Sequence, residues 1–235
     1  MNQQARTGIS FGAALGRITK HCCSALATLV AAVGFSTPAL AHPHVFIDGG
    51  VDFRFGPDRQ LEALEITWIY DPFETLYMLA ENEMMLNADG GLDEADRQEL
   101  QRRLAEFPPD FDGSAHLGAG GAMQVLAWPE NTRVDVVDGR LHMRFTRRLE
   151  TPISAVGDAV DVAFYESTYF FDFSLTEAPK LIGAAEGCTA KVALFDPNSQ
   201  DRALLDVLAK LSREETSDIE NVGSYFADRI SVTCD

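Results

Sequence analysis

The chain alternates between apolar and polar residues over long stretches, as half-buried β-strands do. Residues 44–55 follow this pattern around Gly49-Gly50, where a change in the parity of the apolar positions predicts a bulge or bend. Residues 64–70 then place Leu, Ile, Trp and Tyr on one face, after a turn-forming Gly-Pro-Asp sequence. The pattern predicts a hairpin over residues 51–70.

The apolar spacing changes from two to three or four residues directly after this hairpin. Asp71-Pro72 is typical of a helix start, and the apolar residues that follow repeat at helical spacing. A second helix is predicted over about 93–107, where Pro108-Pro109 ends it. We therefore expect a helical insertion over about residues 72–108.

Strand patterns then return and continue almost to the end of the chain. Asp138-Gly139 is a strong signal for a tight hairpin turn between two of these strands. The expected strands are 123–127, 132–137, 140–148, 158–165, 169–175, 181–184 and 187–195, followed by helices near 200–211 and 217–227 and a closing strand over 229–234. The fold class is therefore α+β, with β-rich, antiparallel, sandwich-like sheets, a helical insertion after the second strand, and C-terminal helices before the last strand.

Residues 1–41 have the three parts of a secretory signal peptide. Their only charges are Arg6, Arg17 and Lys20, an apolar run of about 14 residues follows, and Ala39-Leu40-Ala41 is a small-residue cleavage site. The alternative is a retained anchor, but a helix that spans a bilayer needs about 20 apolar residues. We expect cleavage after Ala41 and a single periplasmic domain over residues 42–235, with no membrane span after signal cleavage.

Acidic residues outnumber basic ones in the chain as a whole. There are 36 Asp and Glu against 19 Lys and Arg, and removing the three basic residues of the signal leaves 16, for a net charge of −20. Such a surface repels phosphate backbones, so we expect no binding to nucleic acid.

Two of the four cysteines would remain after cleavage, Cys188 and Cys234, and each borders a strand-like segment. An even pair in an oxidising compartment predicts a disulfide, which would tether the last strand. The chain-entropy model gives such a bond about 4 kcal/mol. No Cys-x-x-Cys spacing supports a redox or thiolate metal site.

His42-Pro43-His44 is the most informative sequence for chemistry. Residues two apart on a strand share a face, and Asp48 lies further along that face. Imidazole and carboxylate ligands suit zinc first, with nickel, cobalt or copper as alternatives. Cleavage after Ala41 would also free the α-amine of His42 for a copper brace. The competing interpretation is two solvated histidines at a cleavage site.

Three further carboxylates could complete such a metal site: Asp71, Glu166 and Asp172. Each follows or lies within an aromatic strand segment, although a cap, turn or surface role is the commoner use of such a residue. No nucleophile, metalloprotease or phosphate-loop motif is found, so we expect no enzymatic activity.

Residues 84–100 are similar to a degenerate EF-hand loop. With Gly90 at the sharp turn, the ligand positions hold Asn87, Asp89, Asp93 and Asp96. The first ligand position would be Met85, which binds calcium poorly. We therefore expect a capped turn rather than a calcium site.

Taken together, the chain resembles the exported domain-of-unknown-function family numbered 1007, whose members are often labelled as periplasmic components of an uncharacterised ABC-type transport system. The resemblance covers nearly all of residues 41–235. Its markers are Ala41-His-Pro-His-Val-Phe-Ile-Asp48, Thr67-Trp-Ile-Tyr-Asp-Pro-Phe73, the acidic turn before a helix, Tyr165 to Tyr169, Gly187-Cys-Thr189 and Val232-Thr-Cys234. It implies a periplasmic accessory to an inner-membrane nickel/cobalt-type permease, tied in some members to zinc uptake.

Three functional hypotheses follow from these patterns. The leading one is a periplasmic metal-binding accessory of a divalent transition-metal uptake system, in which His42 and His44 supply imidazoles and the nearby carboxylates complete the site. The second is a non-metal adaptor or stabiliser of a membrane permease. The third is a copper oxidoreductase that uses His42 as a brace.

Overall fold

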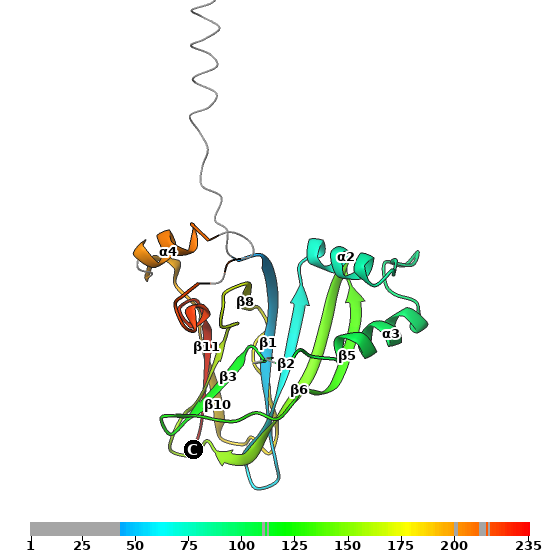
Figure 1. Ribbon diagram of the computed structural model, residues 1–235. Coiled ribbons are helices and arrows are strands. Elements are labelled where there is room, and N and C mark those ends of the chain that lie inside the picture. The colour runs from blue at the N-terminus through cyan, green and yellow to red at the C-terminus, as the bar shows by residue number, and fades with distance from the viewer. Residues whose placement is uncertain (1–42, 110, 112, 200–201, 212–214, 216) are drawn as a thin grey trace, which may run out of the picture. The chain divides into compact units, whose positions relative to one another are not determined.

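The computed structural model describes residues 43–235, apart from residues 110, 112, 200–201, 212–214 and 216. The predicted signal peptide and His42 lie outside the described residues. Two β-sheets dominate the described part of the chain, with three α-helices placed between or after their strands (Figure 1). The expected β-rich α+β class is confirmed.

Sheet A has six strands, in the order β5-β6-β2-β1-β8, with β9 also pairing with β1. Their bounds are β1 Val45–Phe55, β2 Gln60–Tyr70, β5 Glu130–Val137, β6 Arg140–Ser154, β8 Phe171–Leu175 and β9 Leu181–Gly183. The β1–β2 pair is the predicted hairpin, and β5–β6 is the hairpin predicted around Asp138-Gly139. Only β8 and β9 run parallel to their neighbour, β1.

Sheet B has five strands, in the order β10-β11-β7-β3-β4. Their bounds are β3 Ala115–Ala119, β4 Ala122–Met123, β7 Val160–Phe164, β10 Cys188–Ala193 and β11 Asp228–Cys234. Cys188 and Cys234 are register partners and form the expected disulfide, which joins the last strand to β10.

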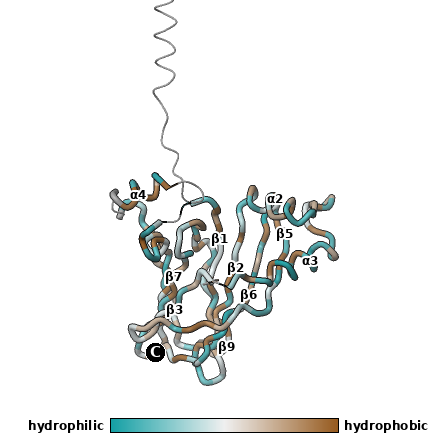
Figure 2. The backbone as a smooth tube through the Cα atoms, viewed as in Figure 1, coloured by the Kyte–Doolittle hydropathy of each residue, from teal (hydrophilic) through white to brown (hydrophobic). Residues whose placement is uncertain are grey.

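One hydrophobic core takes side chains from both sheets. Phe53 and Phe145 of sheet A and Phe164 of sheet B are almost fully buried in it. Hydrophobic and hydrophilic stretches alternate along the strands (Figure 2), and in β1 every second position from Val45 to Phe55 is buried. A second, smaller hydrophobic cluster is formed by Leu208, Val222 and Phe226, between the start of helix α4 (Arg202–Leu208) and the start of β11.

Helices α2 (Pro72–Glu81) and α3 (Glu94–Leu104) pack against strands β6 and β5 of sheet A, respectively (Figure 1). Helix α2 begins at the predicted Asp71-Pro72 start. Leu100 is the one fully buried side chain of α3 and joins the core beside Val134. A short helix, α4 (Arg202–Leu208), follows a 3-10 turn at Pro197–Ser199.

The expected bend at Gly49-Gly50 is wrong. Strand β1 is continuous, its inward side chains keep one parity from Val45 to Phe55, and its register shift lies between Arg54 and Phe55. The glycines are needed for close approach instead: a Cβ on Gly49 would lie 1.9 Å from the carbonyl oxygen of Thr67. The doublet therefore lets two strands and a loop pack tightly without interrupting the strand.

Two other expectations also differ from the structure. Residues 217–227 form a 3-10 helix only at Val222–Tyr225, because their apolar side chains fill the small C-terminal cluster rather than one helical stripe. Strand β3 was missed, and the strand expected over 123–127 shrinks to the two residues of β4 plus an isolated bridge at Leu126. Among the described residues, no helix has the length and hydrophobicity needed to cross a membrane.

Candidate functional site

The predicted ligands gather around the first residues of β1. Asp48 lies on the same outward face of β1 as Phe46, which is 52% exposed, while His44 precedes the strand, is half-buried and has its ring Nε2 atom buried. Parallel pairing with β8 sets Phe46 opposite Asp172, and the His44 amide donates to the Phe170 carbonyl at 2.9 Å. The His44 ring also lies against the Phe170 ring, with centroids 5.0 Å apart. Strand pairing thus brings together residues far apart in sequence.

Asp48 is engaged by a neighbouring strand. Arg140, in the first position of β6, donates from Nη1 to Asp48 Oδ2 at 2.7 Å. The same guanidinium donates from Nε to the Tyr70 carbonyl at 2.8 Å and from Nη2 to the Ile69 carbonyl at 2.9 Å. Arg140 therefore fastens β1 and β2 together, and its positive charge competes with any cation at Asp48.

Asp71 and Glu166 are also bonded by the protein. Asp71 is the N-cap of α2, and its Oδ1 accepts from the Phe73 and Glu74 amides at 2.8 and 2.9 Å. Glu166 closes its own loop, because its two oxygens accept from the Thr168 amide, the Thr168 hydroxyl and the Phe170 amide at 2.8 to 2.9 Å. Both carboxylates thus have a structural use.

Asp172 differs from these three carboxylates. It accepts no hydrogen bond from the described part of the chain and is half-buried. Burial, and then the negative charge of Asp228, raise the pKa of Asp172 above its usual value. Asp228 itself accepts from the Leu175 and Phe195 amides at 2.7 Å. A cation beside Asp172 would therefore stabilise its ionised form.

No group of three or more His, Cys, Asp and Glu side chains converges as a metal site within the residues that the structure covers. His44 and Asp172 are the predicted ligands that it brings near each other without fastening the carboxylate elsewhere. His42, which the copper-brace hypothesis requires, lies outside the described residues. The metal assignment stays a prediction.

The EF-hand-like segment forms a turn held by its asparagine. Asn87 Oδ1 accepts from the Asp89 and Gly91 amides at 3.0 and 3.1 Å, and Asn87 Nδ2 donates to Asp93 Oδ1 at 3.2 Å. Asp93 is the N-cap residue of α3, and Asp96 lies in its first turn. The acidic turn is therefore held by the Asn87 side chain, while Asp93 makes no side-chain hydrogen bond that caps α3.

An aromatic pocket of about 400 Å³ lies next to the Glu166 loop. Trp68, Phe111, Phe170 and Phe173 line it, and Trp68 Nε1 donates to the Ser114 hydroxyl at 3.0 Å. Trp68 also contacts Phe145 edge-on, with ring centroids 5.2 Å apart. This pocket is continuous with the core packing of the two sheets.

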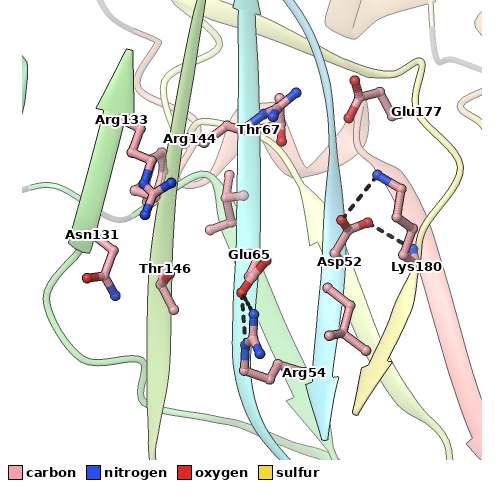
Figure 3. Close-up of a pocket in the computed structure, with 13 residues that line it drawn as sticks. Asp52, Arg54, Glu65, Thr67, Asn131, Arg133, Arg144, Thr146, Glu177 and Lys180 are labelled. Carbon is pink, nitrogen blue, oxygen red and sulfur yellow. Dashed lines mark hydrogen bonds and ion pairs between the residues drawn. The ribbon is translucent and has the colours of Figure 1, made fainter. Parts of the chain in front are cut away.

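A larger cavity, of about 660 Å³, lies on the outward face of sheet A and was not expected from the sequence. Its charged lining consists of Asp52, Arg54, Glu65, Arg133, Arg144, Glu177 and Lys180, and the hydroxyl-bearing Thr67 and Thr146 lie among them (Figure 3). We call this cavity the polar hollow.

Two ion pairs lie side by side in the polar hollow, because their carboxylates belong to Asp52 and Glu65, which are register partners across β1 and β2. Arg54 pairs with Glu65, and Asp52 accepts from the Lys180 amide at 2.8 Å with Lys180 Nζ 3.7 Å away. Arg133, Arg144 and Glu177 behave differently: their charged groups have no hydrogen bond or ion pair with any described residue. Arg133 and Arg144 lie on the β5–β6 side and Glu177 on the opposite side (Figure 3).

The two unpaired arginines are register partners across the β5–β6 hairpin. The signal for this pairing was present in the sequence, because a two-residue turn at Asp138-Gly139 sets Val137 opposite Arg140 and hence Arg133 opposite Arg144. Both turn residues have positive φ, 51° and 74°, as such a turn requires. Counting outward from the turn would have found the pair.

Comparison with known families gives one match. The model of the family described as "Protein of unknown function (DUF1007)" matches residues 27–234. Because the match spans most of the sequence, the chain belongs to this family, as the resemblance predicted. A comparison with curated proteins gives no match.

Among solved structures, the chain is similar to AChBP from Bulinus truncatus, with 12% sequence identity. The alignment covers 89% of this chain and 95% of that chain, with a TM-score of 0.37. At that score the likeness carries no argument about fold or function.

Proposed function

We propose that this chain is an exported metal-binding accessory component of a divalent transition-metal uptake system, acting beside an inner-membrane permease of the nickel/cobalt type. The observation that supports it is the parallel pairing of β1 with β8, which sets Phe46 opposite Asp172 and so brings His44, two residues before Phe46, toward that carboxylate. From strand spacing and rise, diagonal neighbours of this kind are about 8 Å apart at Cα, which is within reach of a shared ion.

The donor set suits zinc first, with nickel, cobalt or copper as alternatives. A neutral imidazole and a carboxylate are ordinary ligands for these ions, and His42 would add a second imidazole two residues before His44. The half-buried Asp172 carboxylate favours an ion, because a cation offsets the combined effect of burial and the Asp228 charge. Binding should weaken below about pH 6, where the histidines take up protons.

Isothermal titration of the purified protein with zinc, nickel and copper tests this proposal. We expect His44→Ala and Asp172→Asn each to weaken zinc binding by about tenfold or more. Matched controls are His142→Ala, a half-buried histidine on the same face of sheet A, and Asp161→Asn, an exposed strand aspartate of β7. Equal affinity in the unmodified protein and in His44→Ala would refute the assignment.

A second candidate function, an adaptor that needs no metal, is supported by the exposed face of α2. Phe73, Leu76 and Tyr77 are 79%, 57% and 49% exposed, and they follow one another at helical spacing. Large apolar side chains exposed together often mark a protein contact. The stripe suits attachment to a membrane permease.

Co-purification with a candidate permease separates the two functions. An adaptor should stay bound in the presence of a chelator and should detach when Leu76→Asp disrupts the α2 face. A matched control is Val137→Asp, which changes an exposed apolar residue beside the β5–β6 turn. Loss of the complex on chelation alone would favour the metal-binding function.

A further inference from the structure

Two like charges face each other in the polar hollow. Arg133 and Arg144 are directly opposite on neighbouring strands, an arrangement that destabilises a sheet when no counter-charge lies between them. The other cations that β1, β6 and the β8–β9 segment contribute to this face have partners: Arg54 with Glu65, Arg140 with Asp48, Arg148 with Glu130, and Lys180 with Asp52. The chain has 36 acidic and only 19 basic residues, so two facing arginines without an acidic partner are unexpected on charge alone.

The acidic residues nearest to the pair do not neutralise it. Glu130 pairs with Arg148, and Asp135, two residues along β5 from Arg133, accepts from the Val136 amide at 2.9 Å. Glu65 is held by Arg54. Two guanidinium groups are thus left with their donors directed to one open cavity, where an oxyanion could bridge them.

An unpaired carboxylate lies across the hollow from the arginines. Glu177 sits above Gly50, because a Cβ on that glycine would lie 3.0 Å from the Glu177 Cβ. Strand pairing continues from Gly50 to Thr67, then to Arg144 and Arg133. Gly50 and Arg144 are therefore two strand steps, or about 10 Å, apart at the backbone. Thr67 lies between Gly50 and Arg144, and because its side chain is small, the floor of the polar hollow stays open.

We propose that the polar hollow binds a small zwitterion of the amino-acid or short-peptide class. The ligand's carboxylate lies between Arg133 and Arg144, and its ammonium group faces Glu177. The Thr67 hydroxyl, on the floor between them, offers a donor and an acceptor to the ligand backbone. A ligand with only negative charge would leave Glu177 uncompensated, and one with only positive charge would leave the arginine pair repelling itself.

The charge pattern can be tested with three peptides of nearly equal size. The purified protein is titrated, in the presence of a chelator, with dialanine, with N-acetyl-dialanine and with dialanine amide. The second peptide lacks the ammonium group and the third lacks the carboxylate. We expect dialanine to bind and each blocked peptide to bind at least tenfold more weakly. Inorganic phosphate, a plain oxyanion, should also bind more weakly than dialanine.

Variants of the lining residues complete the test. Arg133→Gln and Arg144→Gln should each weaken dialanine binding at least tenfold. Glu177→Gln should lower the affinity for dialanine to the affinity that the unmodified protein has for N-acetyl-dialanine. Arg148→Gln and Glu150→Gln, exposed residues of β6 outside the lining, are matched controls that should bind as the unmodified protein does. Removing one of two repelling charges should not unfold the protein, so circular dichroism should be unchanged.

Four results would overturn the proposal, three of them from the peptides and variants. These are no binding of dialanine at millimolar concentration, equal binding of the acetylated peptide, and undiminished binding by Arg144→Gln. Equal binding of phosphate and dialanine would also overturn it, because the hollow would then recognise an anion alone. Since chelator is present throughout, the outcome is independent of whether His44 binds a metal.

Discussion

The start of β1, with its neighbouring loops, and the polar hollow differ in how their charged groups are paired. Around the start of β1, the carboxylates of Asp48, Asp71 and Glu166 accept hydrogen bonds from Arg140, from α2 and from their own loop. In the polar hollow, three charged groups remain without a partner among the described residues. The first region was predicted from the sequence as a binding site, and the second was not. Whether a carboxylate can bind a ligand therefore depends less on its residue type than on whether nearby protein groups already donate hydrogen bonds to it.

The physical reason for this difference is the cost of leaving charges unpaired. A folded chain gains from directing nearby amides and guanidinium groups to its carboxylates, especially where they are half-buried. Charges that stay unpaired next to a like charge cost stability, so their retention is more informative about ligand binding. The predictions below test whether the two regions differ in this way.

The largest effect is expected for Arg140→Ala. The variant should lose about 2 kcal/mol of unfolding free energy, because Asp48 and two strand carbonyls lose a charged donor in a half-buried setting. Urea unfolding measures this as a lower midpoint with an unchanged slope. Arg148→Ala removes a more exposed ion pair from the same strand and should cost about 0.5 kcal/mol or less. Equal losses in the two variants would mean that the half-buried Arg140 contacts stabilise the fold no more than the exposed Arg148–Glu130 pair.

Glu166→Gln should be the next most damaging substitution. The amide keeps the size of the side chain but can accept with only one oxygen, so at least one of the bonds from Thr168 and Phe170 is lost. We expect a loss of about 1–2 kcal/mol in the same assay. Glu177→Gln, which changes an unpaired glutamate, should show no loss. A comparable loss in Glu177→Gln would show that its carboxylate has a structural partner.

Arg144→Gln should stabilise the ligand-free protein by about 0.5 kcal/mol, because it removes one of two facing guanidinium groups. The gain should shrink in high salt, where the repulsion is screened. Thermal unfolding at low and high ionic strength measures both effects. Arg133→Gln should give a similar gain, and combining the two substitutions should add little, since the repulsion is already gone. A loss of stability in either variant would argue against an unpaired charge.

The smallest effect concerns His142, which lies beside the hollow. Burial, and next the Arg144 charge, lower the pKa of His142 below its usual value. Because the unfolded chain binds the proton more readily, this residue's contribution to stability is present above about pH 6.5 and falls as the pH drops below it. His142→Gln should therefore reduce the acid-induced fall in Tm between pH 7.5 and 5 by about 1 °C.

An NMR titration of the His142 ring offers a direct measurement of the same coupling. Arg144→Gln should move the His142 pKa upward, while Arg148→Gln should leave it unchanged. An unchanged value in Arg144→Gln would mean that the arginine points away from the histidine.

Local sequence patterns predicted much of the fold because they report on single elements. The Asp71-Pro72 start of α2, the β1–β2 hairpin and the Asp138-Gly139 turn each depend on a few adjacent residues. The helix expected over 217–227 failed because its apolar residues pack in a cluster with α4 and with Tyr169 and Phe195, and the last two are distant in sequence. The bend expected at Gly49-Gly50 failed because the buried apolar residues on either side, from Val45 to Phe55, keep one parity. What the local pattern could not show is that the two glycines lie against Thr67 and Glu177.

The sequence by itself determined the β-rich class, the pairing of Cys188 with Cys234, and the family. It also contained the register that sets Arg133 opposite Arg144, since a two-residue turn fixes the pairs that follow it as far as the next register shift, which here lies between Glu130 and Arg133. Only the tertiary structure decided which charges are free to act. Arg140 reaches Asp48 because β6 lies on β2 and β2 on β1, and Asp172 reaches the start of β1 through a parallel pairing that no turn encodes. Whether a carboxylate is bonded or available depends on such long-range neighbours, and those neighbours are set by the packing of the whole chain.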